Sequence, residues 1–284
     1  MKNRHFPGRL PALSLALALA LTLAACGSPA QTESPGSSGG NAVIEVTVGV
    51  VGGSNDQWDT VNQLLADEGI HVTLEEFSEY KLPNEALNSG DIDLNAFQHK
   101  AYLEQEIEEL GYELSILGDT VIAPLALYSN SITDVSQLQD GDTIAVPSDP
   151  TNQGRCFKIL ESAGLLEVDP AAGYTPELKD ITSNPLNLEF VEVEASNTPS
   201  LLPDVTAAFV NGAHAVDHGL SLDDAVYTEQ VEPGSDNPYI NVLVCRTQDL
   251  DNEVYQKVLA AYQSDETAQA IEEIFQGAYL PAWA

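Results

Sequence analysis

The chain has 284 residues and a strongly acidic composition, with 44 Asp and Glu against 10 Lys and Arg and a formal charge of −34. This length can hold one large domain or two lobes of ordinary size. Because so acidic a surface is repelled by phosphate backbones and anionic lipid head groups, the composition argues against nucleic-acid binding and against membrane attachment by charge.

The N-terminal segment has the features of an export signal. Three basic residues, Lys2, Arg4 and Arg9, precede an apolar run over 13–25 that is too short to span a bilayer. Leu-Ala-Ala before Cys26 resembles a bacterial lipobox. We therefore expect a cleaved signal peptide that ends before Cys26 and a lipid on the Cys26 sulfur.

Residues 26–42 are rich in Gly, Ser and Pro and cannot bury a core. They are predicted to form a flexible tether. Cleavage of residues 1–25 would remove three of the ten basic residues and no acid, so the formal charge would fall from −34 to −37. Attachment to a membrane is therefore expected through the lipid alone.

Hydrophobic periodicity after the tether predicts alternating strands and helices. A β-branched run over 43–51 reads as a strand, and 57–68 reads as a helix that Gly69 ends. An extended run over 113–129 is long enough to cross between lobes. Further strands are predicted over 72–77, 93–97, 188–194, 207–210 and 237–246, and further helices over 82–87, 100–110, 253–262 and 267–275. Such successive strand–helix units predict an α/β fold with a parallel sheet, and ligands of such sheets bind beyond the carboxyl ends of the strands.

The segment 143–166 reads as a buried strand, a turn and an amphipathic helix. Arg155 falls in the first turns of that helix, after Asp149-Pro150-Thr151-Asn152, and it is one of only two arginines beyond the signal peptide. A helix N-terminus attracts anions, and a guanidinium matches a carboxylate, so the position suits a ligand carboxylate. The alternative is that Arg155 pairs with one of the many acids of the chain.

Motifs typical of enzymes and metal sites are missing from the sequence. It has no G-x-S-x-G elbow between a strand and a helix and no P-loop, H-E-x-x-H, C-x-x-C or G-x-G-x-x-G pattern, so we expect no enzyme activity and no cofactor. His214 and His218 are spaced for a metal ion on a helix, but no further ligands can be placed, so no metal is expected.

Five segments, in order, resemble the signature blocks of methionine-binding (NlpA-type) lipoproteins, the solute-binding components of methionine ABC importers. They are FSEYKLPNEALNSGDIDLNAFQHKAYL, IAVPSDPTNQGR, SNPLNLEFVEVE, FVNGAHA and NPYINVLV. The resemblance covers residues 43–284. It implies a periplasmic-binding-protein-like α/β fold, with two lobes joined by a two-strand hinge and the ligand cleft between them.

The lobes are expected to combine distant parts of the chain. Residues 43–128 with 247–284 would form the first lobe and 129–246 the second, because 237–246 is expected to return beside 124–128. In this division each lobe holds several of the predicted strands.

The resemblance also implies the residues of the site. Carboxylate recognition would fall on Arg155 with help from Asn152, and amino-group recognition on Asn211. Aromatic walls suit a polarizable thioether chain. The side-chain pocket would be formed by Tyr80, Phe97, His99 and Tyr128. His99 lies at the end of a predicted strand, which favours a place in the cleft over a purely structural role.

The implied function is that of a monomeric, lipid-anchored (palmitate-bearing) binding protein at the outer side of the cell membrane. It would capture L- or D-methionine, or a close relative, for an ABC permease and its ATPase. Two alternatives remain open: a surface lipoprotein with a role in adhesion or sensing, and a receptor for a short methionine-containing peptide.

Cys156 and Cys245 stand where the family usually has small or aliphatic residues. In an exported protein such a pair is able to form a disulfide. Two inert thiols in the core are the alternative.

Overall fold

The computed structural model describes residues 43–231 and 236–283. The expected signal peptide, the lipidation site Cys26 and the tether lie outside these residues. Within the described part of the chain, no helix is both long and apolar enough to cross a membrane.

The first of two five-stranded sheets contains both early and late parts of the chain. Its strands, in spatial order, are β2 (Ile70–Phe77), β1 (Ile44–Val51), β3 (Leu94–Asn95), β13 (Val242–Arg246) and β4 (Leu114–Asp119). β1 is parallel to β2 and β3, whereas β13 runs antiparallel to β3 and β4. The expectation of a wholly parallel sheet is therefore wrong at β13.

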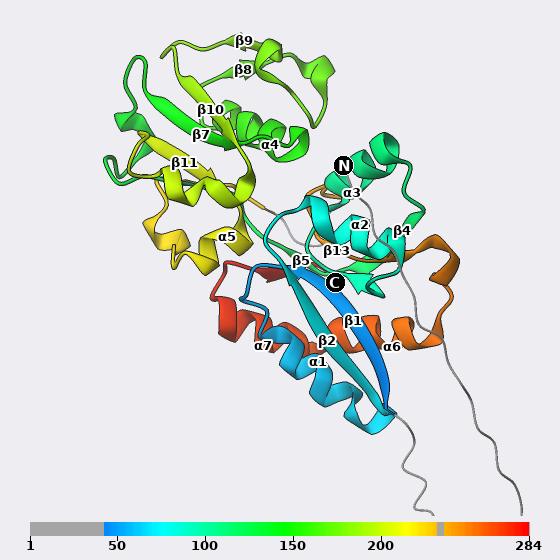
Figure 1. Cartoon of the computed structure of the whole chain (residues 1–284). Helices are drawn as coiled ribbons and strands as arrows, with labels where there is room; N and C mark the ends of the chain where they lie inside the picture. The colour runs from blue at the N-terminus through cyan, green and yellow to red at the C-terminus, as the bar shows by residue number, and fades with distance from the viewer. Residues whose placement is uncertain (1–42, 232–235, 284) are drawn as a thin grey trace, which may run out of the picture. The chain divides into compact units, whose positions relative to one another are not determined.

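Helices cover both faces of this sheet. The helices are α1 (Gln57–Leu65), α2 (Lys81–Ser89), α3 (Lys100–Leu110), α6 (Glu253–Tyr262) and α7 (Asp265–Phe275). Alternation along β13 explains the layers: Leu243 and Cys245 pack with α1, α6 and α7, while Val242 and Val244 pack with α2 and α3. Figure 1 shows α1 beside β1 and β2.

The second sheet is built on the central segment of the chain. Its strands, in order, are β10 (Glu189–Val193), β7 (Thr143–Pro147), β11 (Ala207–Val210), β6 (Ala126–Tyr128) and β12 (Tyr227–Thr228). Helix α4 (Pro150–Ser162) packs on one face, and the short α5 (Gly212–Asp217) packs on the other. The predicted strand over 207–210 is confirmed at both ends.

Small elements complete the described chain. Two pairs of short strands, β5 (Val121–Ile122) with β14 (Leu280–Pro281) and β8 (Glu167–Val168) with β9 (Ile181–Ser183), form separate ladders. Eight 3₁₀ turns occur in the described residues, over Ala66–Glu68, Val135–Gln137, Pro170–Ala172, Leu178–Asp180, Ala195–Asn197, Pro199–Leu201, Leu222–Asp224 and Thr247–Asp249.

The chain crosses between the two sheets at 123–125 and again at 229–241, of which 232–235 are not described. The predicted pairing of 237–246 with 124–128 is wrong, because β13 pairs with β3 and β4, and β6 pairs with β11 and β12. We therefore place β13 in the first lobe and β6 in the second, and we name 123–125 and 229–241 the crossing segments.

The two cysteines lie in different cores. Cys156 belongs to α4 and packs in the core between α4 and the second sheet. Cys245 belongs to β13 and packs in the core of the first sheet with α1 and α6. Both are buried free thiols, so the disulfide is wrong and two core thiols are found. Burial raises the pKa of Cys156 well above its usual value and that of Cys245 to about 11.

We expect the native protein to resist thiol reagents and to gain two reactive thiols on denaturation, with no reducing agent added. Burial of both sulfurs and their raised pKa values are the reason. Colorimetric thiol titration of the mature protein, before and after denaturation, measures this. Cys156→Ser should lower the denatured count by one, and an unreduced wild type with no titratable thiol would contradict the structure.

Candidate functional site

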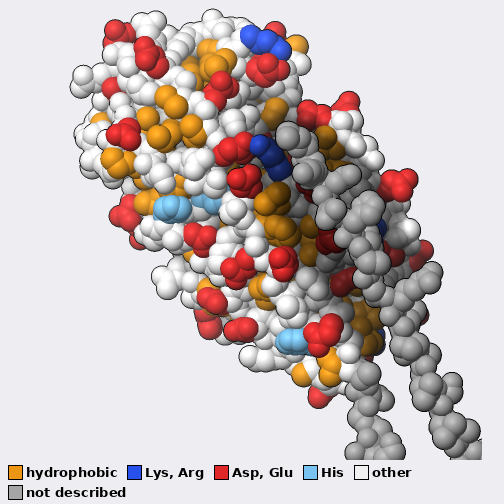
Figure 2. Space-filling view, in the orientation of Figure 1, with side chains coloured by type: hydrophobic (Ala, Val, Ile, Leu, Met, Phe, Trp, Pro, Cys, Tyr) orange, Lys and Arg blue, Asp and Glu red, His pale blue; other side chains and the backbone are white. Residues whose placement is uncertain are grey.

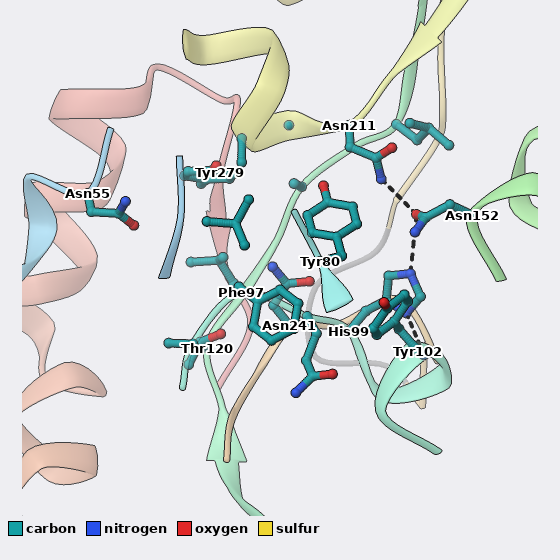
Figure 3. A pocket seen from close by; sticks show the side chains of 18 of the residues that line it. Asn55, Tyr80, Phe97, His99, Tyr102, Thr120, Asn152, Asn211, Asn241 and Tyr279 are labelled. Atoms are coloured by element: carbon teal, nitrogen blue, oxygen red, sulfur yellow. Dashed lines mark hydrogen bonds between the residues drawn. The ribbon is translucent and has the colours of Figure 1, made fainter. Parts of the chain in front are cut away.

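A cavity lies between the carboxyl ends of the first sheet and the N-terminus of α4 (Figure 3). Its empty volume is about 740 Å³, part of which is open solvent, and this is within the usual range for small-molecule sites. The predicted residues that line it are Tyr80, Phe97, His99, Asn152, Arg155 and Asn211. Other lining residues include Tyr102, Leu125, Thr120, Asn241, Tyr262 and Tyr279.

The N-terminus of α4 is buried, which requires partners for its free N–H groups. Asp149 supplies one: it is the N-cap, and its carboxylate accepts the Asn152 backbone N–H at 2.9 Å. Pro150 at the first helical position has no N–H to satisfy. Gly154 allows the helix to approach its neighbours, because a Cβ there would meet the backbone of Thr175 at 2.7 Å. The sequence D-P-T-N-Q-G-R thus places Asn152 and Arg155 at the cavity.

Hydrogen bonds link Asp149 to Asn152 and Asn152 to His99 and Asn211, and Figure 3 shows the last three residues on the cavity wall. The Asn152 amide donates to both Asp149 oxygens, at 3.0 and 3.1 Å, which fixes its own oxygen toward the cavity. That oxygen accepts a hydrogen bond from the Asn211 amide at 2.7 Å and lies 3.4 Å from His99 Nε2. His99 Nδ1 accepts the Tyr102 backbone N–H, so the proton of the neutral ring is on Nε2 and donates to Asn152.

Burial keeps His99 neutral. Burial, together with the nearby Arg155 charge, lowers the pKa of His99 to about 3. Burial also raises the pKa of Asp149, although four hydrogen bonds from Thr151 and Asn152 oppose that shift. His99 therefore acts in this site as a neutral hydrogen-bonding group that also caps α3.

Asn211 has an unused acceptor. Its amide nitrogen donates to Asn152, but its Oδ1 is buried and has no hydrogen-bond partner among the described residues. An unpaired buried oxygen costs about 1–3 kcal/mol. The group is therefore prepared to accept a hydrogen bond from a bound donor.

Aromatic rings form the apolar wall of the cavity. The Tyr80 ring centroid is 5.9 Å from that of Phe97 and 6.0 Å from that of Tyr102, and the Phe97 and Tyr102 centroids are 6.1 Å apart. The Tyr80 ring also contacts the His214 ring, with centroids 5.1 Å apart and planes tilted by 35°. Such a cluster is a polarizable surface that suits an apolar or sulfur-containing chain.

A buried amide network holds this wall in place. The Asn84 amide donates to Gln98 at 2.7 Å and to Glu106 at 2.9 Å, while its oxygen accepts from Asn95 and Gln98. Asn84 belongs to α2, which begins after Tyr80, and Gln98 lies between Phe97 and His99. The network therefore links the two segments that carry the aromatic wall.

Arg155 is the cation of the cavity, and it already has a partner. Its Nε donates to both Glu229 oxygens at 3.0 and 3.1 Å, and its Nη2 donates to Glu229 and to the Ala123 carbonyl. The Tyr239 ring lies under the guanidinium, 4.4 Å from Cζ. Nη1 has no acceptor among the described residues. Arg155 therefore pairs with an acid, as the alternative from the sequence proposed, and it also lines the cavity.

The structure does not bring Tyr128 to the cavity. Side chains alternate along β6, and Tyr128 points with Ala126 to the face covered by α5, whereas Leu127 faces α4. Tyr128 lines a separate, smaller hollow with Val210. Another aromatic residue, Tyr102, lines the cavity beside Tyr80 and Phe97.

Sequence reasoning missed Tyr102, Tyr239, Asn241 and Glu229. Tyr102 was detectable, because it follows His99 by three residues and one helical turn brings the two rings together, 6.2 Å apart. Tyr239 and Asn241 belong to the NPYINVLV segment, which reads as an ordinary strand. Glu229 carries no local signal that separates it from the other acids of the chain.

His214 and His218 were considered as metal ligands from their spacing, and no metal was expected there. His214 is buried, and His218 Nδ1 lies 2.8 Å from the His214 carbonyl oxygen. Among the described residues no group of three or more His, Cys, Asp or Glu is arranged to hold a metal ion.

A second, more open hollow adjoins the cavity and shares Tyr80 and Tyr102 with it. The charged residues that line it are Glu79, Lys81, Glu85, Glu106, Glu109, Asp149 and Glu194. Figure 2 shows how few Lys and Arg lie among the acids on the visible face. The surroundings of the cavity are therefore strongly negative.

Acid should destabilise the protein partly through His99. Its folded pKa of about 3 lies below the ordinary 6.5, so the unfolded state takes up a proton first as the pH falls. The His99 contribution is complete above pH 6.5 and is lost toward pH 3, by about 1.4 kcal/mol per pH unit. His99→Asn keeps a capping side chain and should flatten this slope, as measured by urea unfolding at pH 7, 6 and 5.

The matched control for that prediction is His71→Asn, which removes an exposed histidine of β2. It should retain the pH slope of the wild-type protein. A His99→Asn protein with an unchanged slope would mean that His99 is protonated in the folded state.

The sequence of this chain is similar to those of known proteins. The NlpA lipoprotein family model matches residues 46–283. The probable D-methionine-binding lipoprotein MetQ of Pasteurella multocida is 42% identical over 85% of this chain and 87% of its own length. The D-methionine-binding lipoprotein MetQ of Escherichia coli is 40% identical, over 84% and 88% respectively.

Solved structures of related proteins have a similar fold. The crystal structure of the methionine-binding protein MetQ has a TM-score of 0.80 at 39% identity, covering 84% of this chain and 98% of that one. A nutrient-binding protein from Burkholderia cenocepacia, solved bound to methionine, has a TM-score of 0.79 at 33% identity, covering 84% and 99%. The predicted two-lobe α/β fold is confirmed, and the chain belongs to the NlpA lipoprotein family.

Proposed function

We propose that this chain is an extracytoplasmic solute-binding protein that captures methionine, in its L or D form, and delivers it to an ABC importer. The importer would supply a membrane permease and a cytoplasmic ATPase. Cys26 would carry the lipid that attaches the chain to the cell membrane. In this role the chain binds its ligand and catalyses no reaction.

One observation carries the proposal: a single cavity combines the unused Nη1 edge of Arg155, the unpartnered Oδ1 of Asn211 and the aromatic wall. A guanidinium edge donates to a carboxylate. A buried carbonyl oxygen accepts from an ammonium group. The wall around Tyr80 and Phe97 suits a thioether. These are the three parts of methionine.

The relatives support the same ligand. Those from P. multocida and E. coli carry D-methionine-binding names, and the B. cenocepacia protein was solved with methionine. The sequence identity of 33–42% extends over more than four fifths of this chain. The lipoprotein family also supports the predicted lipid anchor.

The proposal is tested by identifying what the protein binds. The purified protein should release methionine when it is denatured, as measured by mass spectrometry of the small-molecule fraction. After refolding, calorimetry should show one site for methionine. Chiral chromatography of the released compound would assign the L or D form, and a different released compound without any methionine binding would contradict the proposal.

Asn211→Ala should weaken methionine binding by about 1–3 kcal/mol, or roughly fivefold to 150-fold, because the ammonium group loses a buried acceptor. Calorimetry measures the change. Gln269→Ala is a suitable control, since this exposed amide of α7 donates a hydrogen bond to Glu273 and does not line the cavity. Equal affinities of the Asn211→Ala and wild-type proteins would place the ammonium group elsewhere.

Arg155→Ala is a poorer test of the carboxylate site. It would also leave Glu229 buried without its cation, and such a loss costs about 3–5 kcal/mol of stability. Weaker binding by that variant would therefore mix two effects.

A further inference from the structure

Glu229 is a carboxylate near the cavity that is bonded to the Arg155 guanidinium. It accepts two hydrogen bonds from Arg155 Nε and one from Arg155 Nη2, and it accepts the Leu125 backbone N–H at 3.1 Å. The side chains are 4% exposed for Arg155 and 13% exposed for Glu229. This pairing is nearly dry, so it fixes the guanidinium much more firmly than a surface ion pair would.

Glu229 acts on the cavity through the side chain of Arg155 and the backbone N–H of Leu125, two residues that line it. Arg155 lines the cavity and Glu229 does not. The carboxylate holds the Nε–Nη2 edge of the guanidinium, and Tyr239 covers one of its planar faces. The edge that remains for a ligand is Nη1.

The pair also joins the two crossing segments. Glu229 belongs to the second crossing segment and binds the N–H of Leu125 in the first. Arg155 donates to the carbonyl of Ala123, also in the first, at 2.9 Å. The position of the guanidinium is therefore set by both connections between the sheets.

Charge balance has a consequence for the ligand. Arg155 and Glu229 together carry no net charge, Asp149 adds a negative charge nearby, and the adjoining hollow is acidic. A ligand anion would gain from Arg155 but would be opposed by Glu229 and the other carboxylates. A zwitterion brings its own positive group and suffers no such net opposition.

We propose that Glu229 is a positioning and specificity-determining residue: it orients Arg155 and balances its charge, so that the cavity selects zwitterions over anions with the same carboxylate and side chain. This inference rests on the proposed function, since it assumes that the Arg155 edge meets the ligand carboxylate. Glu229 itself does not line the cavity.

The test compares two ligands on three proteins by calorimetry. The ligands are methionine and 4-(methylthio)butanoate, which differs only by lacking the ammonium group. The proteins are the wild type, Glu229→Gln, which removes the charge, and Glu229→Asp, which keeps the charge but shortens the side chain. The measured quantity is the ratio of the two dissociation constants in each protein.

The wild type should bind the anion at least about a hundredfold more weakly than methionine. In Glu229→Gln that ratio should shrink by about tenfold or more, because the Arg155 charge is no longer balanced. In Glu229→Asp both ligands should bind more weakly while the ratio stays near that of the wild type. A role in stability alone would lower the melting temperature without changing the ratio.

Glu161→Gln is a matched control. Glu161 also pairs with a cation of α4, Lys158, but neither residue lines the cavity. This substitution should leave the ratio unchanged. An unchanged ratio in folded Glu229→Gln overturns the inference, as does a wild type that binds both ligands equally well. If Glu229→Gln does not fold, the ratios of dissociation constants in the wild type and in Glu229→Asp are used instead. A ratio below about tenfold in either protein overturns the inference.

Failure of the proposed function looks different. A wild-type protein that binds neither ligand would reject the methionine site itself. A wild type that binds methionine, with no effect of Glu229 on the ratio, rejects only the role of Glu229.

Discussion

The site depends on the burial of the α4 N-terminus. A buried helix end exposes N–H groups that must be satisfied, and Asp149 satisfies one of them while it also fixes the Asn152 amide. From Asn152 the orientation passes to Asn211 and to His99. A single carboxylate thus determines the direction of donors and acceptors on both sides of the cavity. The unused oxygen of Asn211 is the end of that sequence of hydrogen bonds, because each earlier acceptor is already occupied.

Part of this arrangement could be predicted from the sequence. The helix after Asp149-Pro150-Thr151-Asn152 and the place of His99 at a strand end follow from local patterns. For Arg155 the same patterns left two alternatives, a ligand carboxylate and an acidic partner. The helices over 100–110 and 253–262 were predicted with their observed ends. Local patterns cannot give the partner of Arg155, because Glu229 lies 74 residues away in a chain with 44 acids.

The errors have a common physical origin. Tyr128 was placed by the family resemblance and the return strand by its β-prone composition, but a strand presents alternate faces and its neighbour in the sheet is chosen by packing. β13 alternates between two cores and therefore fits only between β3 and β4. The same packing separates Cys245 from Cys156. The fully buried amides Asn84 and Asn95 were also unpredictable, since they resemble loop residues until their network is seen.

Contacts between the lobes differ in how much they can contribute to the free energy of lobe closure. Lys81 with Glu194, and Asp217 with Ser54, join the two lobes at exposed positions. Exposed pairs of this kind contribute about 0–1 kcal/mol and weaken with salt. The buried contact between His99 and Asn152 also joins the lobes, but it is long at 3.4 Å. A ligand that bonds groups from both lobes within the dry cavity adds stronger interactions than these, so ligand binding should dominate the free energy of closure.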